Sequence, residues 1–173
     1  MFKRYLIYLG SPSSLRLWIA AKRRGLPLAN KVLQNLEFTL PGHLSALNEG
    51  RERVQGFLTK VGAPKQDMDL VVMSVDEAVV NVIEHAYKED ESQPIIMRLN
   101  TTADEMVIEV IDQGITPPET LLKSAKTDFS ELPDDVYKID ENGRGLTLIL
   151  TMMDEVEIDL QDNWNIFRMK KFC

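Results

Sequence analysis

The fold is decided by the stretch KQDMDLVVMSVDEAVVNVIEHAY, which occupies residues 65–87. Its apolar side chains recur every three or four residues and form one wide stripe made of Val71, Val75, Ala78, Val79, Val82 and Ala86. A different face of the same helix carries Glu77, Asn81, Glu84 and His85. The pattern therefore predicts a long helix that packs its apolar face on a sheet and presents polar side chains at one edge.

Strand and helix patterns flank this helix on both sides. Alternation of apolar and polar residues predicts strands over 36–40, 95–101, 106–112, 155–160 and 164–172. Helical spacing predicts further helices over 43–61 and 145–153. We expect these elements to form one domain over residues 35–173, with residues 1–34 as an extension.

The extension differs from the domain in charge. Residues 1–36 hold seven Lys or Arg and no acid, so the remaining chain has 13 basic and 27 acidic residues. Such an acidic body argues against direct binding of nucleic acid. Leu15, Trp18 and Ile19 share one helical face of the extension, which would suit an anionic membrane surface. A poorly ordered basic arm is the alternative that we favour.

Cysteine content and hydropathy predict a cytoplasmic location. The single cysteine, Cys173, cannot form an internal disulfide, and with two histidines it does not suggest a zinc site. No apolar run reaches the roughly 18 residues of a membrane span. The apolar stretch after residue 4 ends at Gly10-Ser11-Pro12, which is too early for a secretory signal.

Two residues of the long helix have the chemistry of a phosphoryl-transfer site. Glu77 and Asn81 are four residues apart, so their side chains share a face. A carboxylate can accept a proton from a hydroxyl, and an amide oxygen suits a Mg²⁺ that phosphates already hold. A solvated helix face would explain the same pair, but the strongly apolar opposite face favours a site. His85 is interpreted as a packing or capping residue.

A second segment, Asp112-Gln113-Gly114, follows the strand over 106–112. Asp112 falls on the apolar side of that strand, where a carboxylate is costly unless it meets a hydrogen-bond donor. An adenine amino group would serve as that donor, and a turn starting at the aspartate is the alternative. Gly114 would let the backbone approach a flat ligand.

A third segment, Gly143-Arg144-Gly145-Leu146, opens the predicted helix over 145–153. Backbone N–H groups at a helix start can bind phosphates, and Arg144 would add a charged contact. A plain glycine-rich helix start is the alternative, and no Walker-type lysine pattern occurs in the chain. Residues 113–142 lack a firm period, which indicates a functional lid or a disordered loop.

The order of these segments resembles a known family. Residues 77–87, EAVVNVIEHAY, resemble the N-box of the bacterial anti-sigma factor serine kinases. These kinases belong to the GHKL superfamily, which also includes histidine kinases, gyrase and Hsp90-type chaperones. Residues 112–114 resemble the first glycine box of the family, and residues 143–149 with 153–156 resemble the second. The resemblance covers about residues 36–172.

The resemblance implies a fold and a site. The fold is an α/β (α+β) two-layer sandwich, with a mixed, mostly antiparallel sheet, helices on one face and an ATP lid at about 115–142. Glu77 would be the catalytic base, Asn81 the Mg²⁺ ligand and Asp112 the residue that binds the adenine amino group. The implied nucleotide-binding residues are Asn81, Asp112, Gly114, Gly143, Arg144, Gly145 and Leu146.

The resemblance also implies an activity and partners. Family members use ATP and Mg²⁺ to phosphorylate a serine of a small anti-anti-sigma (STAS-type) protein, and they sequester a sigma factor, usually as homodimers. The first alternative is a sequestration module that binds ATP or no nucleotide and lacks kinase activity. A membrane-associated sensor kinase fragment is disfavoured, because no phosphoacceptor-histidine helix precedes the domain.

One departure from the family pattern bears on nucleotide affinity. The family commonly has Gly-x-Thr in the last strand, with the threonine near the adenine-binding aspartate. Here the stretch reads Trp164-Asn165-Ile166-Phe167, so Ile166 stands where threonine is expected. This predicts weaker nucleotide binding unless Asn165 takes over the role.

Overall fold

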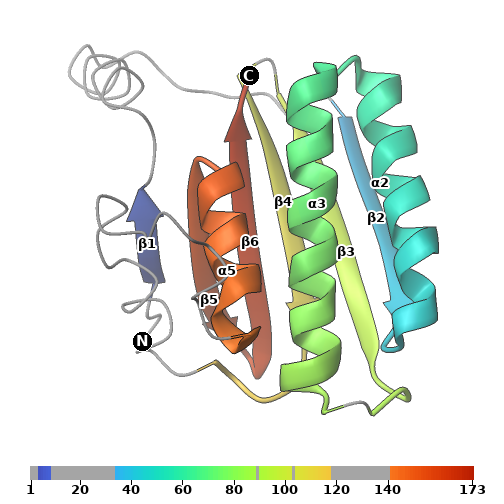
Figure 1. Cartoon of the computed structure of the whole chain (residues 1–173), viewed down its shortest axis with the longest axis vertical. Helices are drawn as coiled ribbons and strands as arrows, with labels where there is room; N and C mark the ends of the chain where they lie inside the picture. The colour runs from blue at the N-terminus through green and yellow to red at the C-terminus, as the bar shows by residue number, and fades with distance from the viewer. Residues whose placement is uncertain (1–3, 9–33, 89, 103, 118–140) are drawn as a thin grey trace.

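The computed structural model describes residues 4–8, 34–88, 90–102, 104–117 and 141–173. These residues form a six-stranded sheet with helices packed on one face (Figure 1). The strands are β1 (Arg4–Tyr8), β2 (Gln34–Pro41), β3 (Pro94–Thr101), β4 (Glu105–Asp112), β5 (Glu155–Gln161) and β6 (Trp164–Phe172). The helices are η1 (Leu44–Ala46), α2 (Leu47–Val61), α3 (Lys65–Asn81), η2 (Val82–Ala86) and α5 (Glu141–Met152). The two-layer α+β sandwich is thereby confirmed.

The sheet differs in one respect from the expected mixed sheet. Its order is β1-β5-β6-β4-β3-β2, and all ladders between the described strands are antiparallel. Two hairpins, β3–β4 and β5–β6, make their own pairs antiparallel. The helix pair α2–α3 returns the chain to the end where β2 finished, so β3 runs against β2. Strands β4 and β5 run in the same direction, but β6 lies between them.

The core lies between the helices and the inner face of the sheet. The predicted stripe of the long helix is buried there: Val71, Val75, Ala78, Val79 and Val82 are each at most 6% exposed. Alternate strand residues complete the core, among them Ile95, Met97, Leu99, Met106, Ile108 and Val110. Each such aliphatic side chain contributes about 1.5–3 kcal/mol on burial. This shared core fixes α3 against β3, β4 and β6.

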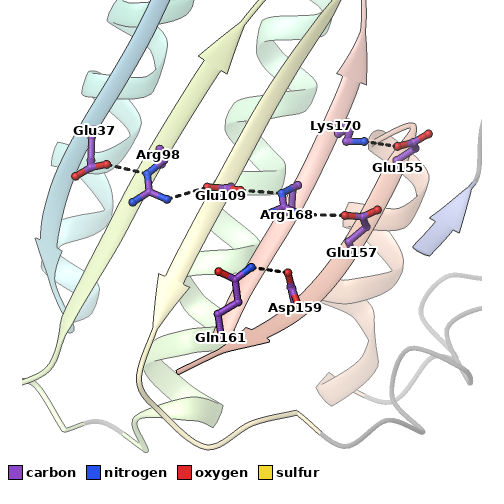
Figure 2. Close-up of polar contacts among 9 residues, drawn as sticks. All are labelled: Glu37, Arg98, Glu109, Glu155, Glu157, Asp159, Gln161, Arg168 and Lys170. Atoms are coloured by element: carbon purple, nitrogen blue, oxygen red, sulfur yellow. Dashed lines mark hydrogen bonds and ion pairs between the residues drawn. The ribbon is translucent and has the colours of Figure 1, made fainter. Parts of the chain in front are cut away.

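The outer face of the sheet carries a ladder of ion pairs that crosses five strands (Figure 2). Glu109 on β4 lies at its centre and accepts hydrogen bonds from Arg98 on β3 (3.2 Å) and Arg168 on β6 (2.7 Å). Arg98 also pairs with Glu37 on β2, and Arg168 with Glu157 on β5. Cross-strand pairs of opposite charge stabilise a sheet and its register. The register leaves Asp112 and Asn165 opposite each other on the inner face.

The sequence pattern predicted one regular α-helix up to Tyr87, but the long helix does not keep α-helical geometry that far. It changes at Asn81 into the π-helix η2, and the backbone N–H of Tyr87 donates to the carbonyl of Val82 at 2.8 Å. A π-turn inserts one extra residue, and such turns often occur at functional sites. The carbonyl of Ala86 accepts from the N–H of Ile115 (2.9 Å), so η2 is attached to the segment after β4.

The extension and the lid are described only in part. Arg4–Tyr8 forms strand β1 at the edge of the sheet, beside β5 (Figure 1). The predicted amphipathic stretch around residues 15–23 and most of the predicted lid, residues 118–140, lie outside the described residues. Within the described part of the chain, no helix has the length and hydropathy of a membrane span.

Candidate functional site

A cavity of about 380 Å³ opens where the end of the long helix, the start of α5 and strands β4, β5 and β6 meet. Its apolar lining comes from Ala78, Val82, Ile115, Leu146, Ile158 and Phe167. Its polar lining comes from Asn81, His85, Asp112, Thr116 and Asn165. A mostly apolar cleft of this volume with a few convergent polar groups is typical of a small-molecule site.

Asp112 lines this cavity and is 4% exposed. Its Oδ1 accepts hydrogen bonds from the backbone N–H of Gly114 (2.8 Å) and from Nδ2 of Asn165 (2.9 Å). Burial raises the pKa of the Asp112 carboxyl, and the two hydrogen bonds oppose that rise. Among the described residues, none donates a hydrogen bond to Oδ2 of Asp112, so this oxygen is available to a ligand.

Gly114 makes a close backbone contact that the sequence did not predict. A Cβ at this position would lie 2.5 Å from the carbonyl oxygen of Ala86 and 2.6 Å from its carbonyl carbon. The missing side chain therefore makes room for the backbone of η2. Any contact of Gly114 with a nucleotide stays a prediction, since Gly114 is not among the cavity-lining residues.

Replacing Gly114 by alanine is expected to destabilise the protein by about 3 kcal/mol, because the new Cβ overlaps backbone atoms that cannot rotate away. The free energy of unfolding is measured by urea denaturation, with circular dichroism as the signal. Gly56→Ala is the matched control, since a Cβ there meets nothing within 4 Å. Equal unfolding free energies for both variants would contradict this packing argument.

Glu77, Asn81 and Gly145 come together although they lie on two different helices. A Cβ on Gly145 would be 2.8 Å from Oε2 of Glu77 and 3.5 Å from both side-chain atoms Oδ1 and Nδ2 of Asn81. The start of α5 therefore rests directly on the polar face of α3. Asn81 lines the cavity, and Glu77 lies one turn earlier on the same helix.

Gly143 and Arg144 of the third segment lie inside helix α5 rather than just before it. The helix α5 begins at Glu141 rather than at Gly145, so Gly143 and Arg144 fall within its first turn. The roles of Gly143 and Arg144 in phosphate binding stay predictions. Leu146 contributes to the cavity wall, as a residue that contacts a nucleotide would.

The electrostatic surroundings of Glu77 favour its protonated form. Partial burial raises the pKa of the Glu77 carboxyl above its ordinary value of 4.5, and the charges of Asp76 and Glu84 raise it further. A carboxylate whose pKa lies closer to neutrality is a better general base.

Two residues of β6 differ from the sequence-based expectation for the cavity, and one residue expected near Asp112 lies elsewhere. Ile166 is on the outer face of the sheet, paired with Ile111, and does not line the cavity. Its neighbours Asn165 and Phe167 do line it. The signal was present, because alternation along β6 puts residues 165 and 167 on the face of Asp112 once the register is known. His85, interpreted from the sequence as a packing or capping residue, also lines the cavity.

Comparisons with known proteins agree with this fold. A family model described as histidine kinase-like ATPase domain matches residues 40–171. Serine-protein kinase RsbW of Bacillus mycoides (strain KBAB4) is 28% identical over 137 residues, covering 79% of this chain and 84% of that protein. RsbW of Bacillus cereus (strain G9842) is 27% identical over the same length and the same shares.

Two solved structures share the fold. The RsbU and RsbW domains of a Mycobacterium tuberculosis protein match with a TM-score of 0.57 and 19% identity, covering 80% of this chain but only 32% of that one. The SiaB–SiaC complex of Pseudomonas aeruginosa matches with a TM-score of 0.56 and 14% identity, covering 94% of this chain and 100% of the other. Because the family model spans most of its length, the chain belongs to the histidine kinase-like ATPase domain family.

Proposed function

We propose that this protein is an anti-sigma factor with ATP-dependent serine kinase activity, which phosphorylates an anti-anti-sigma protein and sequesters a sigma factor. One observation carries the proposal. Asn81 and Asp112 line the same cavity, and Gly145 of α5 lies against both Glu77 and Asn81. The similarity to serine-protein kinases named RsbW supports this choice among the activities of the family.

The described residues fit an adenine nucleotide. The carboxylate oxygen Oδ2 of Asp112 is an acceptor without a donor among the described residues, and an exocyclic amino group would supply that donor. Oδ1 of Asn165 is likewise buried without a hydrogen bond in the described structure. Ile158, Leu146 and Phe167 provide apolar surface for a flat base. The cavity thus combines apolar walls with a carboxylate oxygen that can accept a hydrogen bond from a ligand.

Asn81 is the residue that would hold Mg²⁺. Among the described residues, no three His, Cys, Asp or Glu side chains form a metal-binding group. Mg²⁺ commonly keeps few protein ligands when substrate phosphates provide the others, so a single amide oxygen is sufficient. Bound Mg-ATP supplies the phosphoryl group and the positive charge that transfer requires.

In this proposal, Glu77 acts on the partner's hydroxyl group. As a carboxylate it accepts the proton of a serine side chain while that oxygen attacks, which is the role of a general base. Gly145 leaves the space beside Oε2 of Glu77 free of side-chain atoms. In this proposal, the same protein then releases or binds its partners according to their phosphorylation state.

The alternative without kinase activity is less well supported. The observation in favour of that alternative was Ile166, which stands in place of the expected threonine. Since Ile166 faces away from the cavity and Asn165 contacts Asp112, this departure no longer argues against nucleotide binding. The presence of Glu77 beside Gly145 favours a catalytic role.

A two-part experiment tests the proposal. Isothermal titration calorimetry measures Mg-ATP binding, and labelled ATP then measures phosphate transfer to a candidate STAS-type protein. We expect micromolar to millimolar affinity and the formation of phosphoserine. No binding at millimolar Mg-ATP would overturn the kinase proposal, whereas binding without transfer to any such partner would favour the sequestration alternative.

The pH dependence of transfer follows from the raised pKa of Glu77. Transfer needs the ionised carboxylate of Glu77, so the rate of transfer is expected to rise with pH. This acidic limb of the pH profile should have its midpoint above pH 4.5. Over the same interval the folded protein binds more protons than the unfolded chain, so Glu77 lowers the unfolding free energy as pH rises.

Replacing Glu84 by glutamine is expected to move that acidic limb to lower pH, because it removes a negative charge that raises the pKa of Glu77. Glu52→Gln, which changes an exposed acid on α2, is the control and should leave the limb in place. The measurement is the pH profile of single-turnover transfer. An unchanged limb in Glu84→Gln, or an equal shift in the control, would rule out this electrostatic coupling.

A further inference from the structure

Asn165 is the buried polar residue of the cavity that the family pattern does not assign. It is 3% exposed and lies on β6 directly opposite Asp112 on β4. Both hydrogens of its amide nitrogen are used: Nδ2 donates to Oδ1 of Asp112 (2.9 Å) and to the carbonyl oxygen of Gly114 (3.1 Å). The amide therefore joins the end of β4 to the residue that packs on η2.

These contacts fix which way the amide points. The two neighbours of Nδ2 are both acceptors, so turning the amide over would place Oδ1 against two oxygens. Oδ1 must then point away from Asp112 and Gly114. It is buried and has no hydrogen-bond partner among the described residues. A buried acceptor without a donor is costly.

The same contacts determine which carboxylate oxygen of Asp112 is available to a ligand. Gly114 and Asn165 both donate to Oδ1, so the carboxylate cannot rotate without losing two hydrogen bonds. This leaves Oδ2 as the oxygen that can accept from a ligand. Donation to a carboxylate favours its ionised form, and an ionised carboxylate only accepts hydrogen bonds.

We infer that Asn165 is a positioning residue that holds Asp112 as a fixed acceptor. The cavity thereby selects a base that carries an N–H donor over a base that carries an oxygen at the same ring position. The inference rests on the proposed function, because it assumes that the cavity takes a purine nucleotide. Adenine presents an amino donor, and hypoxanthine presents an oxo acceptor at the same ring position. Two acceptors facing each other repel, so the fixed Asp112 excludes the oxo base.

Two variants and one control test the inference. Asn165→Leu keeps the branched shape of the side chain, with a larger volume, but removes both donors. Asn165→Asp puts a second carboxylate beside Asp112, and two carboxylates at this distance do not both ionise. Ile166→Val changes the neighbouring residue on the outer face and should behave as wild type. Circular dichroism and thermal melting check that each variant is folded.

The first readout uses the protein without nucleotide. Carbon-13 NMR titration of the Asp112 carboxyl should show a higher pKa in both Asn165 variants than in wild type and in Ile166→Val. A role of Asn165 in packing alone would leave this titration unchanged. An unchanged Asp112 titration in both variants would overturn the inference whatever the nucleotide affinities are.

The second readout compares ATP with inosine triphosphate by calorimetry in the presence of Mg²⁺. Wild type should prefer ATP by about 10–100-fold, the range for one hydrogen bond to a charged group. Asn165→Leu should lose most of that preference through weaker ATP binding. If wild type binds ATP and the Asn165 variants keep the same preference for ATP, the inference is overturned but the proposed function is not. If wild type does not bind ATP, both the inference and the proposed function are overturned.

Discussion

Replacing Glu77 by glutamine is expected to slow phosphate transfer by about 10²–10⁴-fold, the contribution of a general base. Glutamine keeps the shape of the side chain beside Gly145 but cannot accept the serine proton. Affinity for Mg-ATP should change little, because Glu77 does not line the cavity. The measurement is single-turnover transfer from labelled ATP to the partner protein, together with calorimetric binding of Mg-ATP.

The matched control for Glu77→Gln is Asp69→Asn. Asp69 is an exposed acid two turns earlier on α3, and it pairs with Lys65 rather than with the site. Its replacement should leave transfer within a few-fold of wild type. Transfer by Glu77→Gln at the wild-type rate would show that another group takes the proton, and the mechanism proposed here would be wrong.

Replacing Asn81 by alanine is expected to remove the metal-dependent part of nucleotide binding. We expect a loss of about 100-fold or more in Mg-ATP affinity, because even the outer-shell partners of metal ligands contribute about 10–100-fold. Asn81 reaches the cavity from the last turn of α3, next to Gly145. Alanine is a good helix former, so α3 should keep its structure. Calorimetry with and without Mg²⁺ measures the effect.

Chelation of the metal separates this role from simple packing. In excess EDTA, wild type and Asn81→Ala should bind ATP with similar, weak affinity, because neither then uses a metal ligand. Asn35→Ala, which changes an exposed asparagine on β2, is the control and should retain Mg²⁺-dependent binding. Retention of that dependence by Asn81→Ala would exclude Asn81 as the magnesium ligand.

Periodicity was sufficient to predict most of the fold. The apolar stripe of residues 71–82 is buried against the sheet, and β6 occupies residues 164–172 as predicted. These features follow from local chemistry, because a half-buried strand or helix must expose one face and bury the other. The helix of residues 65–87 also presented Glu77 and Asn81 on one polar face, which packing against α5 then brought to Gly145.

Tertiary contacts determined what periodicity did not predict. The change from α-helix to π-helix at Val82 accompanies the packing of Ala86 against Gly114, two segments far apart in sequence. The contribution of Asn165 depends on the register of β6 with β4, which no local pattern specifies. Strand β1 forms only by pairing with the distant β5, so its apolar residues alone gave no indication of their partner.

One titration tests most directly whether four distant segments surround a single nucleotide. Nitrogen-15 NMR of the wild-type protein, titrated with a Mg²⁺-bound, non-hydrolysable ATP analogue, reports on the amides of Asn81, Gly114, Gly145 and Asn165 together. We predict that all four resonances shift with one common dissociation constant. Shifts confined to one segment, or different dissociation constants for the segments, would contradict a shared site.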